Sequence, residues 1–182
     1  RIARMLIRLV RKGGGSALPG LILSKIAPGI LWRVLDGFTG GLVIVTGSAG
    51  KSTTTKMLVA IAREHGLSVF TNPSTANILQ GFYSTIIEKS SLSGRISADI
   101  AILEMDEAHA ESLTTKVAPR QVTVMNVMED QLDRFVDPAF VRDDLAKVAG
   151  RATESVILNA DDQNTIIIGD GLTEDLVSWF GI

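Results

Sequence analysis

Residues 42–55 read LVIVTGSAGKSTTT, and the fold is decided here. The first four residues are a short apolar, β-branched run, which is typical of a strand buried on both faces. Two glycines follow within four residues, and residues 53–62 then have helical spacing. The residues expected to share the buried face of that helix are Met57, Leu58 and Ile61. The stretch therefore predicts a strand, a glycine loop and a helix.

The chemistry of this loop points to phosphate. Glycines let the backbone turn tightly and approach a ligand, and the start of a helix presents unpaired N–H groups to an anion. Lys51 adds a positive charge, and the Ser52 hydroxyl is a ligand for the Mg²⁺ that accompanies a nucleotide. The alternative is a tight turn with no ligand. The predicted nucleotide-binding residues of the loop are Gly47, Ser48, Ala49, Gly50, Lys51, Ser52 and Thr53.

The number of residues between its two glycines distinguishes this loop from the common phosphate loop. That loop has four residues between its glycines, whereas two separate Gly47 from Gly50 here. The short form with trailing threonines resembles the Mur ligase superfamily, whose members use ATP to join amino acids to muramyl or folyl substrates. The superfamily usually has Thr-Asn or Thr-Lys where this chain has Ser48-Ala49.

The composition is that of one globular domain. The chain has 182 residues, of which 46% are hydrophobic and 21% charged, and its net charge is −2. This charge gives no reason to expect a nucleic-acid partner. Cysteine is absent, which excludes disulfides and thiolate metal sites within the chain. No apolar run reaches the roughly 18 residues that span a bilayer.

The N-terminal residues 1–12 predict a basic amphipathic helix, with residues 13–16, Gly-Gly-Gly-Ser, as a flexible link. The helix either packs on its own domain or rests on an anionic membrane surface. We expect a cytoplasmic location, with contact at the inner face of the membrane left open. Residues 1–40 are expected to form a helical segment packed on the core, and residues 41–182 an ATP-binding domain.

A third strand is expected over 99–103, and an acidic cluster follows it. A carboxylate at the tip of a buried strand is costly without a cation, and Mg²⁺ is the natural cation beside a phosphate loop. Glu104 is therefore the candidate metal ligand together with Ser52, and Lys51 and Glu104 are the candidate catalytic residues. The alternative is a set of acids that favours a helix N-terminus, which suits Asp106 and Glu107.

Three further loops contribute candidates. Residues 72–77 follow the second predicted strand, either as a helix cap or as a ligand loop, and the resemblance assigns the latter role to Asn77. Residues 126–135 resemble the superfamily's Asn-x-x-x-Asp-His-x-Asp loop, with Gln131 in place of the histidine. Residues 159–162 match its Asn-Ala-Asp-Asp, which implies nucleotide contacts for Asn159 and Asp162, although such clusters are also ordinary turn chemistry.

The order of elements predicts an α/β fold. Five strand–helix units in sequence imply a doubly wound, mostly parallel sheet with right-handed crossovers. The loops after its strands then lie at one edge, where such sheets bind ligands.

The N-terminal Gly-Gly-Gly-Ser-Ala-Leu-Pro-Gly run and the Asp-Gln-Leu-Asp-Arg segment at 130–134 narrow the resemblance to the MurT type. These proteins are subunits of lipid II isoglutaminyl synthase, an enzyme of peptidoglycan biosynthesis. The resemblance implies ATP and Mg²⁺ as cofactors, lipid II as substrate, and a GatD-type glutaminase partner in a heterodimer. Its product would be D-isoglutamine, formed from D-glutamate through an acyl phosphate.

Two alternatives remain at this point. One is another amide ligase of the superfamily, such as a folylpolyglutamate synthase, and the other is a nucleotide-binding interaction module without ligase activity. The superfamily's zinc ribbon and C-terminal ligase domain have no counterpart in residues 41–182. The chain is therefore expected to be a fragment that can at most bind nucleotide.

Overall fold

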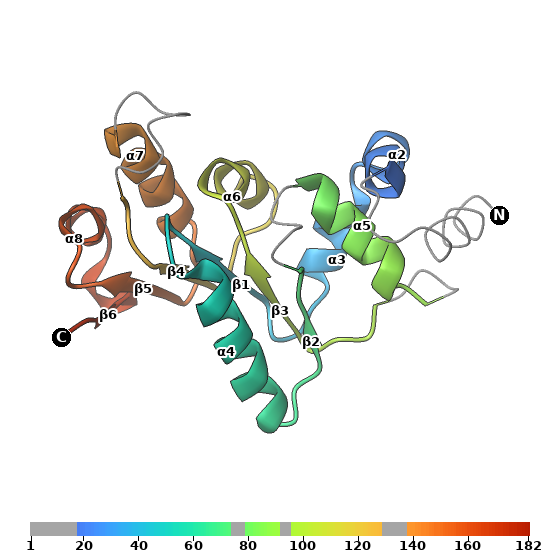
Figure 1. Cartoon of the computed structure of the whole chain (residues 1–182), viewed down its shortest axis with the longest axis horizontal. Coiled ribbons are helices and arrows are strands. Elements are labelled where there is room, and N and C mark those ends of the chain that lie inside the picture. The colour runs from blue at the N-terminus through green and yellow to red at the C-terminus, as the bar shows by residue number, and fades with distance from the viewer. Residues whose placement is uncertain (1–17, 74–78, 92–95, 129–137) are drawn as a thin grey trace.

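The structure, a computed structural model, describes residues 18–73, 79–91, 96–128 and 138–182. These residues form one six-stranded sheet in the order β2-β3-β1-β4-β5-β6, and every neighbouring pair is parallel (Figure 1). The strands are β1 (Leu42–Thr46), β2 (Val69–Phe70), β3 (Ile100–Glu104), β4 (Gln121–Val124), β5 (Ser155–Asn159) and β6 (Val177–Phe180). The predicted α/β fold with a parallel sheet is confirmed.

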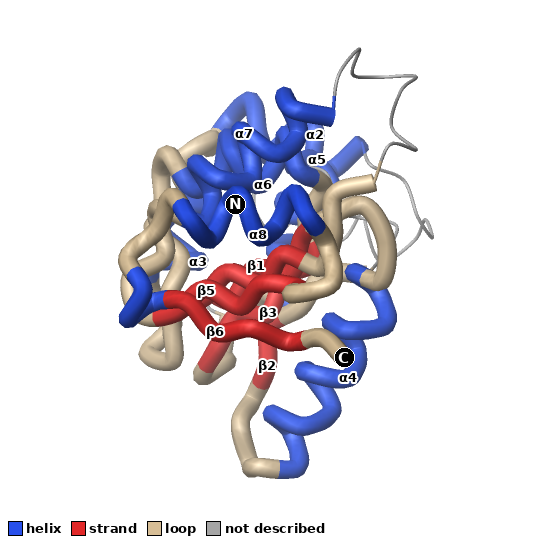
Figure 2. Tube along the Cα trace, turned by 90° about the vertical axis from the view of Figure 1, so that its left-hand side faces the viewer, coloured by secondary structure: helices blue, strands red, loops and turns tan. Residues whose placement is uncertain are grey.

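Helices cover both faces of the sheet. They are α2 (Leu18–Ile26), α3 (Ile30–Asp36), α4 (Lys51–Glu64), α5 (Leu79–Lys89), α6 (Glu107–Thr114), α7 (Pro138–Ala149) and α8 (Gln163–Asp170), with a 3₁₀ turn, η3, at Glu174–Leu176. Helix α4 lies on one face, whereas α5, α6 and α7 lie on the other (Figure 2). The sheet is therefore doubly wound, as predicted.

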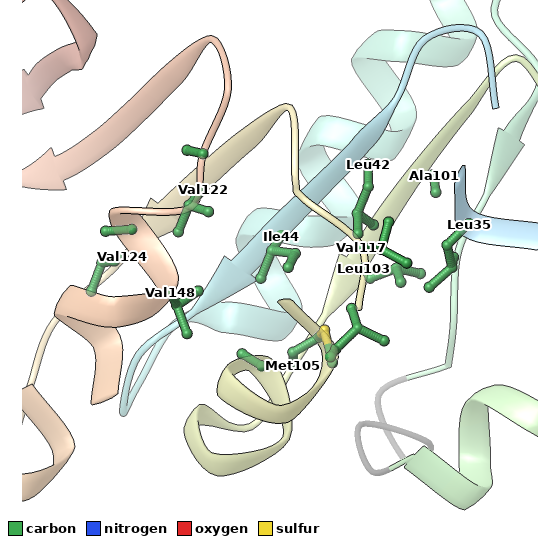
Figure 3. Packing of buried hydrophobic residues seen from close by; sticks show 14 of the residues in the cluster. Leu35, Leu42, Ile44, Ala101, Leu103, Met105, Val117, Val122, Val124 and Val148 are labelled. Carbon is green, nitrogen blue, oxygen red and sulfur yellow. The ribbon is translucent and has the colours of Figure 1, made fainter. Parts of the chain in front are cut away.

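The alternation of side chains along β1 divides the core in two. Leu42 and Ile44 point into the large cluster beneath α5, α6 and α7, together with Leu103 of β3 (Figure 3). Val43 points to the opposite face and forms a small cluster with Val59 of α4 and Ile102 of β3. A strand that buries alternate residues on two covered faces reads as a continuous apolar run, which explains the sequence of β1.

The predicted buried face of α4 is wrong in two of its three positions. Met57 is 59% exposed and Ile61 is 54% exposed. The helix packs on the sheet through Leu58, Val59 and Ala62 instead. Met57 and Ile61 each lie two residues from Val59, which is about 200° around a helix, so they point to solvent.

Helix α3, strand β2 and helix α4 have well-defined ends. Helix α3 begins at Ile30, two residues after Pro28. The second strand, which was expected before the loop at 72–77, pairs with β3 only over Val69–Phe70. Gly66 follows the end of α4 with a left-handed φ of +81°, and its N–H donates to the Arg63 carbonyl.

The helix predicted over 1–12 lies outside the described residues, as does the link at 13–16. Helices α2 and α3 precede β1, and α2 packs against α5. Within the parts of the chain that the structure describes, no helix is both long enough and apolar enough to cross a bilayer.

Candidate functional site

The sheet order brings three loops together at one edge. Strand β1 lies between β3 and β4, with Val45 beside Glu104 and Thr46 beside Val124 in the register. All three strands are parallel, so the segments that follow them leave the sheet at the same edge. The glycine loop, Glu104 and Asn126 therefore become neighbours, although they are far apart in sequence.

Both glycines of the loop have the left-handed φ that favours glycine. Gly47 has a φ of +114°, and Gly50, the N-cap of α4, has a φ of +86°. A Cβ on Gly47 would lie 2.7 Å from the carbonyl oxygen of Asn126 and 2.9 Å from its nitrogen. Backbone atoms of a packed strand end cannot move aside easily, so this position needs glycine for space as well as for conformation.

Asn126 forms three hydrogen bonds with the glycine loop. The Ala49 N–H donates to Asn126 Oδ1 at 2.8 Å, and Asn126 Nδ2 donates to the Ala49 carbonyl at 3.2 Å. The Ser48 N–H donates to the Asn126 carbonyl at 3.0 Å. The amides of Ser48 and Ala49 are thus held by the chain itself. The N–H groups at the start of α4, which have no intrahelical acceptors, remain as the expected phosphate donors.

Lys51 and Ser52 mark the head of α4. The Lys51 ammonium donates to the carbonyls of Gly47 and Ser48, the latter at 3.1 Å. Ser52 Oγ donates to Glu104 Oε1 at 2.7 Å. A hollow of about 300 Å³ opens here, and its lining comprises Ser48, Gly50, Lys51, Ser52, Thr53 and Glu104. The predicted proximity of Glu104 to the loop is confirmed, and the binding roles of these residues stay predictions.

The residues present fit a magnesium ion. Ser52 and Glu104 offer a hydroxyl and a carboxylate within hydrogen-bond distance of each other, and Mg²⁺ prefers such hard oxygen ligands. It usually takes one or two protein carboxylates and completes its shell with phosphate and water. Within the described residues no group of three or more His, Asp or Glu side chains could hold a metal by itself. A site that depends on nucleotide phosphates suits this arrangement.

Comparison with known proteins places this geometry in a family. Residues 45–177 match the Mur ligase middle domain. The chain belongs to the Mur ligase family. The matched span starts in β1 and ends in β6, so it contains the whole glycine loop and Glu104.

Two curated relatives are named lipid II isoglutaminyl synthase (glutamine-hydrolyzing) subunit MurT. The protein from Streptococcus pneumoniae is 35% identical over 158 residues, which cover 84% of this chain and 34% of the relative. The protein from Staphylococcus aureus (strain COL) is 29% identical over 162 residues, which cover 89% and 36%. The chain thus spans about a third of the length of these relatives.

A solved Mur ligase has the same fold. The MurF ligase from Thermotoga maritima, crystallised in complex with ADP, superposes with a TM-score of 0.65 at 20% identity. The match covers 90% of this chain and 36% of that one. At this identity the comparison establishes the fold of the Mur ligase domain.

Glu107 is a residue of the site that sequence reasoning missed. Its side chain is 1% exposed, neither carboxylate oxygen has a hydrogen-bond partner, and Oε1 lies 3.7 Å from Lys51 Nζ. Burial raises the pKa of Glu107, and the nearby Lys51 ammonium opposes that rise. The sequence favours a helix-terminus acid at this position. Only the fold, which brings the start of α6 beside the start of α4 at the same edge of the sheet, shows that the carboxylate faces the loop lysine.

Asn72 begins the loop predicted over 72–77, and its contact with Glu104 is a second feature that sequence reasoning missed. Its Nδ2 donates to the Glu104 carbonyl at 3.0 Å, and the Glu104 N–H donates to Asn72 Oδ1 at 3.0 Å. The buried amide therefore ties the segment that follows β2 to the last residue of β3, and it fixes the backbone of the candidate metal ligand. A polar residue directly after a strand at the ligand-binding edge is the sequence signal that could have found it.

The remaining candidates have mixed outcomes. Asp162 caps α8 by accepting from the N–H groups of Asn164 and Thr165, and also accepts from the Val127 N–H at 2.8 Å. Asn159 Nδ2 donates to the Met125 carbonyl at 3.0 Å. Both side chains thus tie the loop after β4 to β5, and their nucleotide contacts stay predictions. Asn77 and the segment at 130–134 lie outside the described residues.

Proposed function

We propose that the protein to which this chain belongs is an ATP-dependent amide ligase of peptidoglycan biosynthesis, which amidates the D-glutamate of lipid II to D-isoglutamine. The observation that carries the proposal is the hydrogen-bonded Ser52–Glu104 pair beside Lys51 at the head of α4. The names of the MurT relatives support the choice of substrate. The ADP-bound Mur ligase supports the choice of nucleotide.

The proposed reaction has two steps. A carboxylate oxygen of the acceptor attacks the γ-phosphorus of ATP, the bond to the β-phosphate oxygen breaks, and ADP leaves. Ammonia then attacks the acyl phosphate, a C–N bond forms, and inorganic phosphate leaves. The ammonia is proposed to come from a glutaminase partner of the GatD type, which the words "glutamine-hydrolyzing" and "subunit" in the relatives' names support.

The roles of this chain's residues follow from phosphoryl-transfer chemistry. Lys51 would neutralise charge on the transferring phosphoryl group, and the N–H groups at the start of α4 would orient the phosphates. Ser52 and Glu104 would hold Mg²⁺, which supplies further charge neutralisation when bound. To bind phosphate, the Lys51 ammonium must exchange its contacts with the Gly47 and Ser48 carbonyls for phosphate oxygens.

The test is mass spectrometry of lipid II incubated with the full-length protein, ATP and glutamine, with and without the glutaminase. We expect a change of one carboxylate to an amide, a loss of about 1 Da, that requires both proteins. Amidation with ammonium chloride replacing both glutamine and glutaminase is expected as well, because ammonia is the attacking species. Addition of an amino acid to a folyl substrate, with lipid II unchanged, would instead identify a folyl ligase, and this assignment would be wrong.

A further inference from the structure

A second cavity lies beside the phosphate hollow. It has a volume of about 230 Å³ and lies between α4 and the segment that leaves β2. Ser52 and Glu104 line both this cavity and the phosphate hollow. A molecule in the second cavity would therefore contact the same two side chains that face the end of the triphosphate.

The position of the cavity relative to the nucleotide follows from the loop chemistry. In phosphate loops the lysine reaches the β- and γ-phosphates and the adjacent hydroxyl ligates Mg²⁺. Ser52 thus marks the γ-phosphate end. The cavity continues from Ser52 along α4 toward β2, away from β4 and β5. It is therefore on the side from which an acceptor carboxylate would reach the γ-phosphorus.

The lining of the cavity combines cations with an apolar wall. Lys56 and Arg63 of α4 line it, and within the described residues neither forms an ion pair with an acidic side chain. Val59 and Pro73 contribute apolar surface. Thr55, which is 4% exposed, also lines the cavity, and its Oγ1 has no hydrogen-bond partner. Free cations beside an unpartnered hydroxyl are the groups that an oxyanion needs.

The spacing of the cations sets the length of the ligand. Lys56 lies four residues after Ser52, a rise of about 6 Å, and Arg63 lies about 10 Å further along the helix. Consider an acceptor whose reacting carboxylate lies at Ser52. If its second anionic group is close to that carboxylate, the second group would reach Lys56. A more distant anion would reach Arg63.

The geometry points to this cavity as the subsite for a second anionic group of the acceptor, a carboxylate or a phosphate, with Lys56 and Arg63 as specificity-determining residues. This inference rests on the proposed function, because it takes the acceptor to be a carboxylate that is phosphorylated by ATP. It adds to that function the requirement that the acceptor carry another negative charge.

The experiment compares Lys56→Ala, Arg63→Ala and the double variant with the control Lys116→Ala in the full-length protein with its glutaminase. Lys116 is an exposed lysine that does not line the cavity. Both cavity cations are on a helix surface where alanine is well tolerated, so folding should be retained. The KM is measured for two acceptors. One is lipid II, which carries a diphosphate, and the other is a muramyl pentapeptide that lacks it.

We expect the KM for lipid II to rise about tenfold in each single variant, with kcat and the Kd for MgADP unchanged. If the KM for the muramyl pentapeptide is unchanged, the bound anion is the diphosphate; if both KM values rise equally, it is a carboxylate. A KM for both acceptors within twofold of wild type in the double variant would overturn the inference.

Acceptor binding to the MgADP-loaded protein, measured by calorimetry, separates this inference from the proposed function. Weaker lipid II binding in the double variant, in a protein that never forms the amide, would support the subsite and contradict the function. If the protein forms the amide but wild type and double variant bind lipid II with the same affinity, the function would be supported and the subsite contradicted.

Discussion

At the scale of single residues, Lys51 and Glu107 depend on each other. Lys51→Ala is expected to abolish nucleotide binding, measured by calorimetry, because the charge that meets the phosphates is lost. The same change removes the ammonium that lies 3.7 Å from Glu107 Oε1, whose side chain is 1% exposed. An uncompensated buried charge is costly and is relieved by taking up a proton. The variant should therefore also show a new dependence of stability on pH.

The sign of that dependence follows from the pKa of Glu107, which burial raises above its ordinary 4.5. The folded state holds the proton more tightly than the unfolded state, so this contribution is present at low pH and is lost as pH rises through the folded pKa. Without Lys51 the pKa rises further. Each added unit costs roughly 1.4 kcal/mol of unfolding free energy at neutral pH.

Urea unfolding of Lys51→Ala between pH 4.5 and 8, a range chosen to bracket the shift, measures this cost. Lys51→Ala/Glu107→Gln is the matched control, in which the extra slope should disappear because the titrating group is absent. Parallel pH profiles for wild type and Lys51→Ala would show that the lysine does not compensate the Glu107 charge.

Gly47 and Gly50 both have positive φ, but they differ in the space around them. Gly47→Ala places a Cβ 2.7 Å from a backbone oxygen, whereas a Cβ at Gly50 would meet Met125 Cε at 3.5 Å, an ordinary van der Waals distance. Gly50→Ala should thus cost only the left-handed strain of about 1–2 kcal/mol. Gly47→Ala should cost more and lower nucleotide affinity further, as measured by urea unfolding and calorimetry. Equal losses for the two variants would contradict the close approach of Asn126.

At the scale of elements, α4 serves the site with its first turn and the sheet with one narrow face. Val59 is 6% exposed and packs on Val43 and Ile102. Val59→Ala is expected to lower the unfolding free energy by roughly 2 kcal/mol, because the contacts of Val59 with Val43 and Ile102 are lost and a small cavity remains between α4 and the sheet. Met57→Gln and Ile61→Gln should change it by less than about 0.5 kcal/mol, since these side chains are mostly in solvent.

Thermal or urea unfolding distinguishes the two α4 faces, and the glutamine variants are the controls for Val59→Ala. A loss in Ile61→Gln as large as the loss in Val59→Ala would mean that a further segment of the protein covers the outer face of α4.

At the scale of the whole molecule, the strand order is what assembles the site. The crossover from β1 to β2 passes over the position later filled by β3, and the chain then continues on the other side of β1 with β4. Glu104 and Asn126 consequently flank the glycine loop from opposite sides. Glu104 is 52 residues from its partner Ser52 in sequence, and Asn126 is 77 residues from its partner Ala49. A site built from such distant segments is expected to lose all its parts together when the sheet unfolds.

The sequence by itself determined the strand–loop–helix unit, the parallel α/β class and the candidates Lys51, Ser52 and Glu104. These depend on local patterns: an apolar run, glycine spacing, and a charge placed directly after a strand. Helix α4 was also predicted, but its buried face was not, because Met57 and Ile61 are as apolar as the residues that pack. Which face is buried depends on the sheet beneath it.

Only the tertiary structure decided which side chains meet. Asn72, Asn126 and Glu107 look like ordinary turn and helix-cap residues in the sequence, and the signals there are the same for a cap and for a contact across the fold. Their partners are supplied by strand β3, by the glycine loop and by the first residue of α4. Hydrogen bonds and ion pairs act over a few ångströms in space, and distance along the chain does not predict that separation until the strand order is known.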